Sequence, residues 1–150
     1  MERFLRCCVI VSCLLLLLTG AAKIFSAVAG ESGILDTVDP VFGIAFTKLM
    51  LLAGVLEIMI SIVCLKIVSL RKKLFVLAWF SVLLFLYRID LWSLHFDAHC
   101  PCLGNLTDAL GIPANVVDSV TIYLLAYLII TNCGGLILGQ FHQLKKRTAT

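Results

Sequence analysis

Charged residues are scarce in this sequence. Only 14% of its 150 residues are Asp, Glu, Lys or Arg, whereas 61% are hydrophobic and the mean hydropathy is +1.09. A soluble domain must present more charge than this on the surface that faces water, so the composition excludes a soluble globular protein. We therefore expect lipid to be the solvent for most of the chain.

The sequence also lacks the alternation of apolar and polar residues that marks the strands of a membrane barrel. Its apolar runs are continuous, and in hydrocarbon a helix satisfies every backbone N–H and C=O within itself. Four runs are long enough to cross a bilayer as helices, and they cover residues of about 7–28, 42–68, 74–94 and 116–141. The sequence therefore predicts an all-α bundle of four transmembrane helices that forms a single domain over residues 1–150.

Two of the three loops between these runs lack lysine and arginine. The first carries acidic residues such as Asp36 and Asp39, and the loop at 95–115 carries Asp97 and Asp108. The cations at the ends of the runs all lie on the other side of the predicted bundle: Arg3, Arg6, Lys66, Arg71, Lys72, Lys73, Lys145, Lys146 and Arg147. Because cytoplasmic loops collect positive charge, we expect a multi-pass membrane protein whose termini are both cytoplasmic.

The first run has a second interpretation. Basic residues before an apolar stretch, with Ala27-Val28-Ala29 after it, are also typical of a secretory signal and its cleavage site. The run is longer than the apolar segment of most signals, and Lys23 lies between it and the cleavage motif. Both features favour a retained span, and the later spans keep their orientation under either interpretation.

The predicted topology sorts the seven cysteines by compartment. Five lie in the cytoplasmic halves of their runs, where thiols stay reduced, and we interpret them as small packing residues: Cys7, Cys8, Cys13, Cys64 and Cys133. Cys100 and Cys102 lie on the outer, oxidising side. They are close enough in sequence to form a disulfide with each other.

The Cys100-Pro101-Cys102 motif closes a smaller ring than a Cys-x-x-Cys motif does. Extended residues two apart are separated by roughly 6.6–7 Å, near the upper limit for a disulfide, and proline restricts the backbone further. We therefore expect a strained bond, and strained, exposed disulfides are the labile ones. A structural role is a poor alternative, because closing so short a loop removes little entropy. The motif favours thiol–disulfide exchange.

Two histidines, His95 and His99, lie four residues apart beside this motif. One interpretation is that an imidazolium lowers the pKa of a nearby thiol and raises its thiolate fraction. A second is that the four N and S donors bind zinc or copper, although ligands so close in sequence form a tetrahedron only if the loop wraps around the ion. A third is an inert surface loop.

Five charged residues fall inside the apolar runs: Lys23, Lys48, Glu57, Arg88 and Asp90. Each costs on the order of 2.5–3.5 kcal/mol at the centre of a membrane helix, so partners or a function are expected. Glu57 lies deepest and is about 180° from Lys48 around their helix, so its partner must lie elsewhere. Lys23 and Arg88 are the candidates. Lys48 instead fits a side chain that extends to the headgroups.

The predicted bundle also holds several aromatic residues: Trp79, Phe85, Tyr87, Trp92, Tyr123 and Tyr127. Cations and aromatic rings beneath a reactive thiol pair suit a quinone headgroup, which would receive the electrons of the thiols. The alternative is that these rings are ordinary interfacial and core residues.

Three sequence features together resemble the MauE branch of the DoxX-like membrane proteins, the methylamine utilisation MauE family. Residues 18–25, Leu-Thr-Gly-Ala-Ala-Lys-Ile-Phe, are similar to the Gly-x-x-Lys signature of that family. Glu57 matches its acidic residue in the second helix, and residues 100–104, Cys-Pro-Cys-Leu-Gly, match its Cys-x-Cys-[Phe/Leu]-Gly loop. The likeness spans the whole chain.

The resemblance implies a four-helix bundle with a redox role. Named members help to mature the disulfide-rich small subunit of methylamine dehydrogenase together with a thioredoxin-like partner, and many relatives lie outside methylamine metabolism. A more distant likeness to quinone-linked four-helix thiol oxidases is incomplete, because those enzymes carry two cysteine pairs and this chain has one on the outer side.

We therefore predict a thiol–disulfide redox protein of a bacterial inner membrane. In it Cys100 or Cys102 exchanges with a periplasmic thioredoxin-like protein that serves exported, disulfide-containing clients. Lys23, Glu57 and Arg88 are expected to shape the bundle interior beneath the loop. The alternatives are a non-catalytic assembly factor that binds a partner through the loop, and a metal-binding membrane protein. No nucleic-acid partner is expected.

Overall fold

Four helices make up most of the structure. The computed structural model describes residues 2–29, 38–94 and 114–147. Helix α1 covers Glu2–Ala29, α2 covers Phe46–Lys66, α3 covers Leu70–Ser93 and α5 covers Ala114–Arg147. Each contains a segment long and apolar enough to cross a bilayer. The all-α, four-helix membrane architecture expected from the sequence is therefore confirmed.

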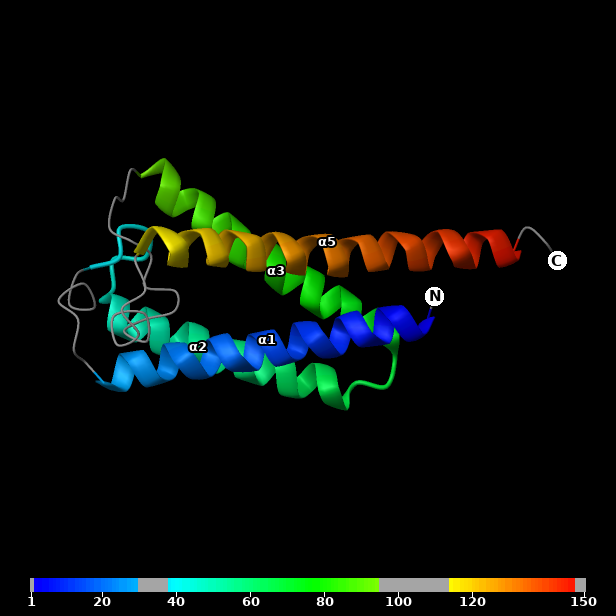
Figure 1. The fold of residues 1–150 in the computed structure, drawn as a ribbon, viewed down its shortest axis with the longest axis horizontal. Coiled ribbons are helices and arrows are strands. Elements are labelled where there is room, and N and C mark those ends of the chain that lie inside the picture. The colour runs from blue at the N-terminus through cyan, green and yellow to red at the C-terminus, as the bar shows by residue number, and fades with distance from the viewer. Residues whose placement is uncertain (1, 30–37, 95–113, 148–150) are drawn as a thin grey trace.

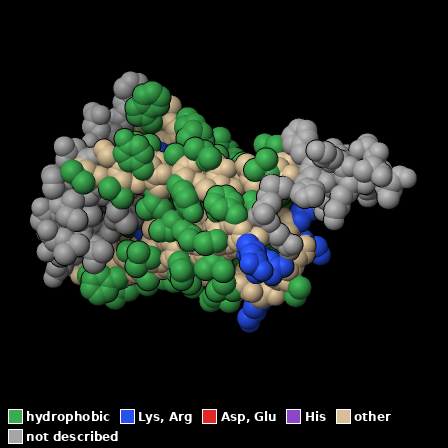
Figure 2. All heavy atoms as spheres, turned by 45° about the vertical axis from the view of Figure 1, so that its right-hand side comes forward, with side chains coloured by type: hydrophobic (Ala, Val, Ile, Leu, Met, Phe, Trp, Pro, Cys, Tyr) green, Lys and Arg blue, Asp and Glu red, His purple; other side chains and the backbone are tan. Residues whose placement is uncertain are grey.

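The helices alternate in direction through the bundle (Figure 1). At one end α1 begins, α2 leads into α3 and α5 ends. This end is termed the basic end, since its cations include Arg3, Arg6, Lys66, Arg71, Lys72 and Lys73. At the opposite end, termed the loop end, α1 and α3 finish and α2 and α5 start. Figure 2 shows Lys and Arg side chains gathered at the basic end and apolar side chains over the flank.

The helix boundaries differ by several residues from the apolar runs, and two of these differences, in α5 and at the start of α2, have a clear physical reason. Helix α5 has 34 residues, which at 1.5 Å per residue is about 51 Å, whereas the hydrocarbon core is about 30 Å thick. Its helical backbone therefore continues past the membrane span, because a helix does not have to end where its side chains become polar. Helix α2 begins at Phe46 instead of residue 42, because residues 38–45 form a turn.

Two helix pairs build the bundle: α1 packs mainly against α2, and α3 mainly against α5. A buried cluster with side chains from all four helices joins the pairs: Val9, Cys13, Leu16, Cys64, Leu74, Leu77, Phe80 and Leu128. Other large apolar side chains point outward, and Phe4, Leu18 and Ile130 are each 70% exposed. Such an apolar exterior suits lipid and not water.

The backbones of α1 and α2 come very close together at two glycines. A Cβ added to Gly20 would lie 2.9 Å from the carbonyl oxygen of Gly54, and one added to Gly54 would lie 2.8 Å from the carbonyl oxygen of Gly20. Real Cβ atoms do not come this close to backbone oxygen. Small residues at a membrane helix interface allow this contact, because packing rather than the hydrophobic effect holds helices together in lipid.

The turn at 38–45 is closed by Asp39 and Gly43. Oδ1 of Asp39 accepts hydrogen bonds from the backbone N–H groups of Val41 (2.9 Å) and Phe42 (2.7 Å). Gly43 has a φ of 66°, in the left-handed region that favours glycine. The carboxylate of a buried aspartate therefore closes the turn that precedes α2, whose N-cap residue Ala45 makes no side-chain capping hydrogen bond.

The same aspartate also links the turn to α3 by a hydrogen bond. Oδ2 of Asp39 accepts a 2.6 Å hydrogen bond from the Tyr87 hydroxyl. The Phe42 ring also stacks on the Tyr87 ring, with 5.8 Å between their centroids. The start of α2 and the last turns of α3 are thus joined at the loop end.

Enlarging Gly54 should push α1 away from α2. We expect Gly54→Ala to lower the free energy of unfolding by about 1–3 kcal/mol, as overpacking usually does, because the added Cβ would meet backbone. SDS titration in mixed micelles, followed by circular dichroism, measures this change. Gly134→Ala on α5 is the matched control, since its Cβ enters open space. Equal stability of the two variants would contradict the close contact.

Removing the Tyr87 hydroxyl should loosen the loop end. We expect Tyr87→Phe to destabilise the protein by about 1.5–3 kcal/mol, the usual range for a hydrogen bond to a charged group. In a double variant, Tyr87→Phe should add little to the loss of stability caused by Asp39→Ala, because both changes remove the same hydrogen bond. Thermal unfolding measures it, with the exposed Tyr123→Phe as the control. Full additivity of the two losses would mean that the two side chains act independently.

Candidate functional site

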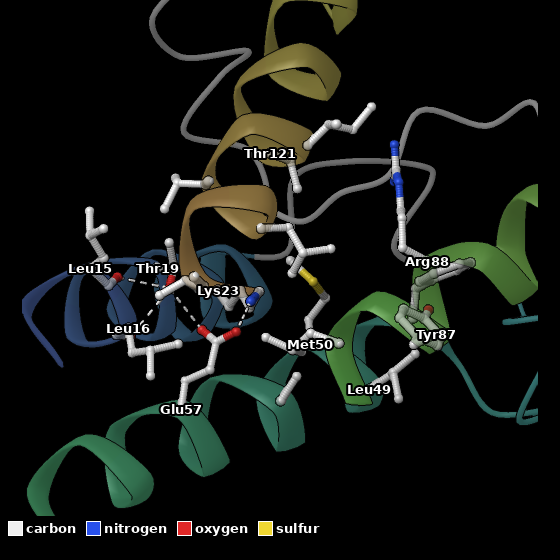
Figure 3. A pocket seen from close by; sticks show the side chains of 17 residues that line it. Leu15, Leu16, Thr19, Lys23, Leu49, Met50, Glu57, Tyr87, Arg88 and Thr121 are labelled. Atoms are coloured by element: carbon white, nitrogen blue, oxygen red, sulfur yellow. Dashed lines mark hydrogen bonds and ion pairs between the residues drawn. The ribbon is translucent and has the colours of Figure 1, made fainter. Parts of the chain in front are cut away.

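A cavity lies between the two helix pairs, in the half of the bundle nearer the loop end (Figure 3). Its volume is about 120 Å³. An engineered cavity of about 150 Å³ binds benzene, so this space is close to that of one six-membered ring. Apolar side chains from every helix line most of it, including Leu16, Met50, Leu84 and Leu128.

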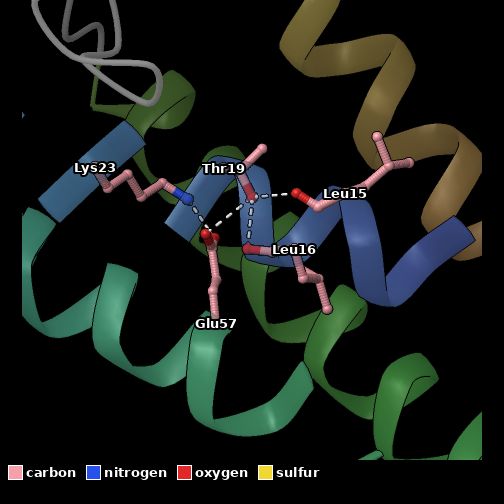
Figure 4. A network of polar contacts seen from close by, with 5 residues as sticks. All are labelled: Leu15, Leu16, Thr19, Lys23 and Glu57. Atoms are coloured by element: carbon pink, nitrogen blue, oxygen red, sulfur yellow. Dashed lines mark hydrogen bonds and ion pairs between the residues drawn. The ribbon is translucent and has the colours of Figure 1, made fainter. Parts of the chain in front are cut away.

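One wall of the cavity carries a polar cluster of Thr19, Lys23 and Glu57 (Figure 4). The Lys23 ammonium on α1 forms an ion pair and hydrogen bond with Oε1 of Glu57 on α2. The Thr19 hydroxyl lies 3.0 Å from Oε2 of Glu57 and 3.0 Å from the Leu15 carbonyl oxygen. Its single proton serves one of these acceptors at a time. Both carboxylate oxygens of Glu57 therefore face donors from α1.

Burial makes this ion pair important for the bundle. Glu57 is 1% exposed and Lys23 is 8% exposed, so neither charge reaches solvent on its own. A buried charge that has lost its partner is strongly unfavourable, whereas the pair is tolerated. Thr19 and Lys23 are four residues apart, which places both on the face of α1 that meets α2.

The glycine contact brings the ion pair together. A Cβ on Gly20 would lie 3.1 Å from the Cβ of Glu57, so the two helices meet beside the carboxylate. Lys23 lies less than one helical turn beyond Gly20. The close approach of the backbones therefore lets a short glutamate side chain reach α1.

The expectation that Glu57 finds its partner on another helix is confirmed, and that partner is Lys23. Arg88, the other candidate, lines the cavity from α3 together with Tyr87. In Figure 3 the Arg88 and Tyr87 side chains lie across the cavity from the Lys23–Glu57 pair. Two cationic residues thus border one mostly apolar space.

The two remaining intramembrane charges lie away from the cavity. Lys48 is exposed on α2, as expected for a lysine that extends to the headgroups. Asp90 is exposed near the end of α3, where its backbone carbonyl oxygen accepts a 2.8 Å hydrogen bond from the Ser93 hydroxyl. Neither side chain lines the cavity.

His95, His99, Cys100 and Cys102 lie outside the described residues. The helices that flank them are described: α3 ends at the loop end and α5 begins there. Among residues 2–29, 38–94 and 114–147, no three His, Cys, Asp or Glu side chains come together in a way that could hold a metal ion. The metal-binding hypothesis therefore rests on the segment at 95–113.

The cysteines of the basic half are free thiols. Cys8, Cys13 and Cys64 are buried, which confirms their interpretation as packing residues. Cys13 and Cys64 contact each other between α1 and α2, and the Ser61 hydroxyl donates a 2.7 Å hydrogen bond to the Cys13 carbonyl oxygen. Cys7 is exposed, so its interpretation as a packing residue is wrong.

Two polar residues were missed by the sequence reasoning. Thr19 could have been found from its four-residue spacing to Lys23. Asn132 is fully buried on α5, and its Nδ2 donates to the Leu128 carbonyl oxygen (2.8 Å) and lies 3.5 Å from the Ser12 hydroxyl on α1. Nothing in the apolar run around Asn132 indicated which helix it would face.

Comparison with protein-family models, curated proteins and solved structures finds no match for this chain.

Removing one partner of the ion pair should leave a buried, unpaired charge. We expect Lys23→Met to lower the free energy of unfolding by about 3–5 kcal/mol, and a second change, Glu57→Gln, to restore part of that loss. SDS titration of the purified protein measures both. Lys48→Met is the matched control, because an exposed lysine should change stability by less than about 0.5 kcal/mol. Equal effects at the two lysines would rule out a stabilising pair.

Proposed function

We propose that this chain is a thiol–disulfide redox protein of a bacterial inner membrane. In this proposal its termini are cytoplasmic. Its Cys100-Pro101-Cys102 motif exchanges with a periplasmic thioredoxin-like protein that acts in disulfide formation or maturation of exported proteins. One observation carries the proposal: the motif connects α3 to α5 at the loop end, opposite the cations of the basic end. That position supports an outer, oxidising location for the pair.

The exchange needs one thiolate and one disulfide. A thiolate of Cys100 or Cys102 attacks one sulfur of the partner's disulfide and displaces the partner's other sulfur as a thiolate, which gives a mixed disulfide. The second cysteine then attacks the first, closes the Cys-Pro-Cys disulfide and releases the partner as a dithiol. Two electrons pass to the partner, and the reverse sequence returns them. His95 and His99 would raise the thiolate fraction.

A quinone headgroup is the redox cofactor that the cavity suits. The space of about 120 Å³ fits one ring, its walls are mostly apolar, and Arg88 and Lys23 carry N–H donors suited to ring carbonyl oxygens. Lys23 has three N–H groups, so its bond to Glu57 leaves others for a ligand. When bound, a quinone accepts two electrons and two protons. Glu57 would hold a proton on the same wall.

The resemblance to the MauE family supports this function over the two alternatives, because it places a Cys-x-Cys loop and a thioredoxin-like partner in one system. Methylamine metabolism itself is not part of the proposal. A non-catalytic assembly factor would use the same loop for binding, without any need for its thiols. The two functions therefore differ in what happens when the thiols are removed.

Removing one thiol of the pair should trap the partner. We expect either Cys100→Ser or Cys102→Ser, whichever removes the resolving thiol, to accumulate a mixed disulfide with the thioredoxin-like protein. The adduct is measured as a band of higher mass on non-reducing gels and identified by mass spectrometry. The variant that lacks both thiols should form none, because no sulfur remains to attack.

Cys133→Ser is the matched control for this trapping experiment, because that thiol lies on α5 in the half of the bundle nearer the basic end. It should leave the amount of adduct unchanged. If neither single variant forms an adduct and the double variant still matures exported disulfide proteins, the assembly-factor function is favoured. Zinc or copper in the purified wild type, lost on replacing His95 and His99, would favour the metal-binding function.

A further inference from the structure

A second hollow lies between α3 and α5 near the basic end, and it shares no lining residue with the cavity beside the ion pair. It is a groove of about 810 Å³, within the range of about 300–1,000 Å³ that small-molecule sites occupy. Its floor is formed by Phe75 and Val76 of α3 and by Leu136 and Ile137 of α5. Phe75 is 62% exposed and Ile137 is 54% exposed. The groove therefore offers apolar surface that helix packing leaves uncovered.

Two cationic side chains lie at one end of this groove. Arg71 and Lys72 line it, and both are exposed in the first turn of α3. The positive end of the α3 dipole lies at the same place, and Ser69 makes no side-chain capping hydrogen bond there. Among the described residues that line the groove there is no acidic side chain. The groove thus combines an apolar floor with a positively charged mouth.

The position of the groove limits what can occupy it. The segments Leu70–Ser93 and Ser119–Gln140 are membrane spans, so Phe75 and Ile137 lie at a depth that is reached from the lipid phase. A soluble anion would leave this apolar floor uncovered, and a neutral lipid would leave the two cations without a counterion. An occupant needs an anionic head and an apolar tail together.

We propose that the groove binds one anionic phospholipid, with its phosphate between Arg71 and Lys72 and an acyl chain along the α3–α5 floor. Basic pockets between membrane helices on the cytoplasmic side are suited to such headgroups. The proposal does not depend on the redox function, since it uses residues at the opposite end of the bundle. It assigns a binding role to Arg71 and Lys72, in addition to the effect of these cations on the orientation of the spans.

Lipid retention by the purified full-length protein tests this site. Native mass spectrometry after incubation with phosphatidylglycerol or phosphatidylcholine of the same chain length should show one retained phosphatidylglycerol and no comparable phosphatidylcholine. Arg71→Gln with Lys72→Gln should weaken retention on the order of 30-fold, at about fivefold per cation. Lys66→Gln is the matched control, because Lys66 is exposed at the same end but does not line the groove. Equal retention of both lipids would overturn the proposal, as would equal loss in Lys66→Gln.

A second measurement uses the wild type alone and does not depend on a variant that folds. Cys133 lines the groove, whereas Cys7 is exposed on α1 outside it. In nanodiscs, a lipid-soluble maleimide should modify Cys133 several-fold more slowly with phosphatidylglycerol than with phosphatidylcholine, while Cys7 reacts equally in both. In phosphatidylcholine nanodiscs, millimolar glycerol phosphate should not slow the reaction of Cys133, since a headgroup alone does not cover the floor. Equal Cys133 rates in both lipids would overturn the site, and slowing by glycerol phosphate alone would replace the lipid with a soluble anion.

Discussion

The contact between the backbones of α1 and α2 at Gly20 and Gly54 determines the interior of this protein. In lipid, apolar side chains gain little by leaving their surroundings, so helices associate through close packing and polar contacts. The glycines supply the first, and the Lys23–Glu57 ion pair beside them supplies the second. The ion pair depends on the glycine contact, because the glutamate reaches α1 only where the helices nearly touch.

The remaining helices are held less tightly to this pair, and that difference creates the cavity. α3 packs mainly on α5, and two buried clusters join the two pairs: the larger one extends from the middle of the bundle towards the basic end, and Phe46 with Leu91 lies near the loop end. Near the loop end the pairs are also linked by the turn before α2, where Asp39 accepts the hydrogen bond from Tyr87. A mostly apolar space with a few polar groups on its walls therefore lies between the two helix pairs.

Much of this organisation could be predicted from hydropathy and charge. The number of helices and their alternating direction follow from the lengths of the apolar runs. A deep carboxylate required a partner on another helix, yet the choice between Lys23 and Arg88 depended on how each helix is rotated, which composition does not encode. The later start of α2 depended on a turn that Asp39 and Gly43 close together. The redox hypothesis rests on residues outside the described part of the chain. The structure therefore bears on it only through the helices that flank those residues and the cavity between the helix pairs.

The Lys23–Glu57 pair also has a consequence for biosynthesis. The segment that carries Glu57 would enter the bilayer alone at a cost on the order of 2.5–3.5 kcal/mol, and α1 emerges from the ribosome first with its own unmatched lysine. If both leave the translocon as a hairpin, each neutralises the other before either meets lipid. Membrane insertion and the first tertiary contact would then be a single event.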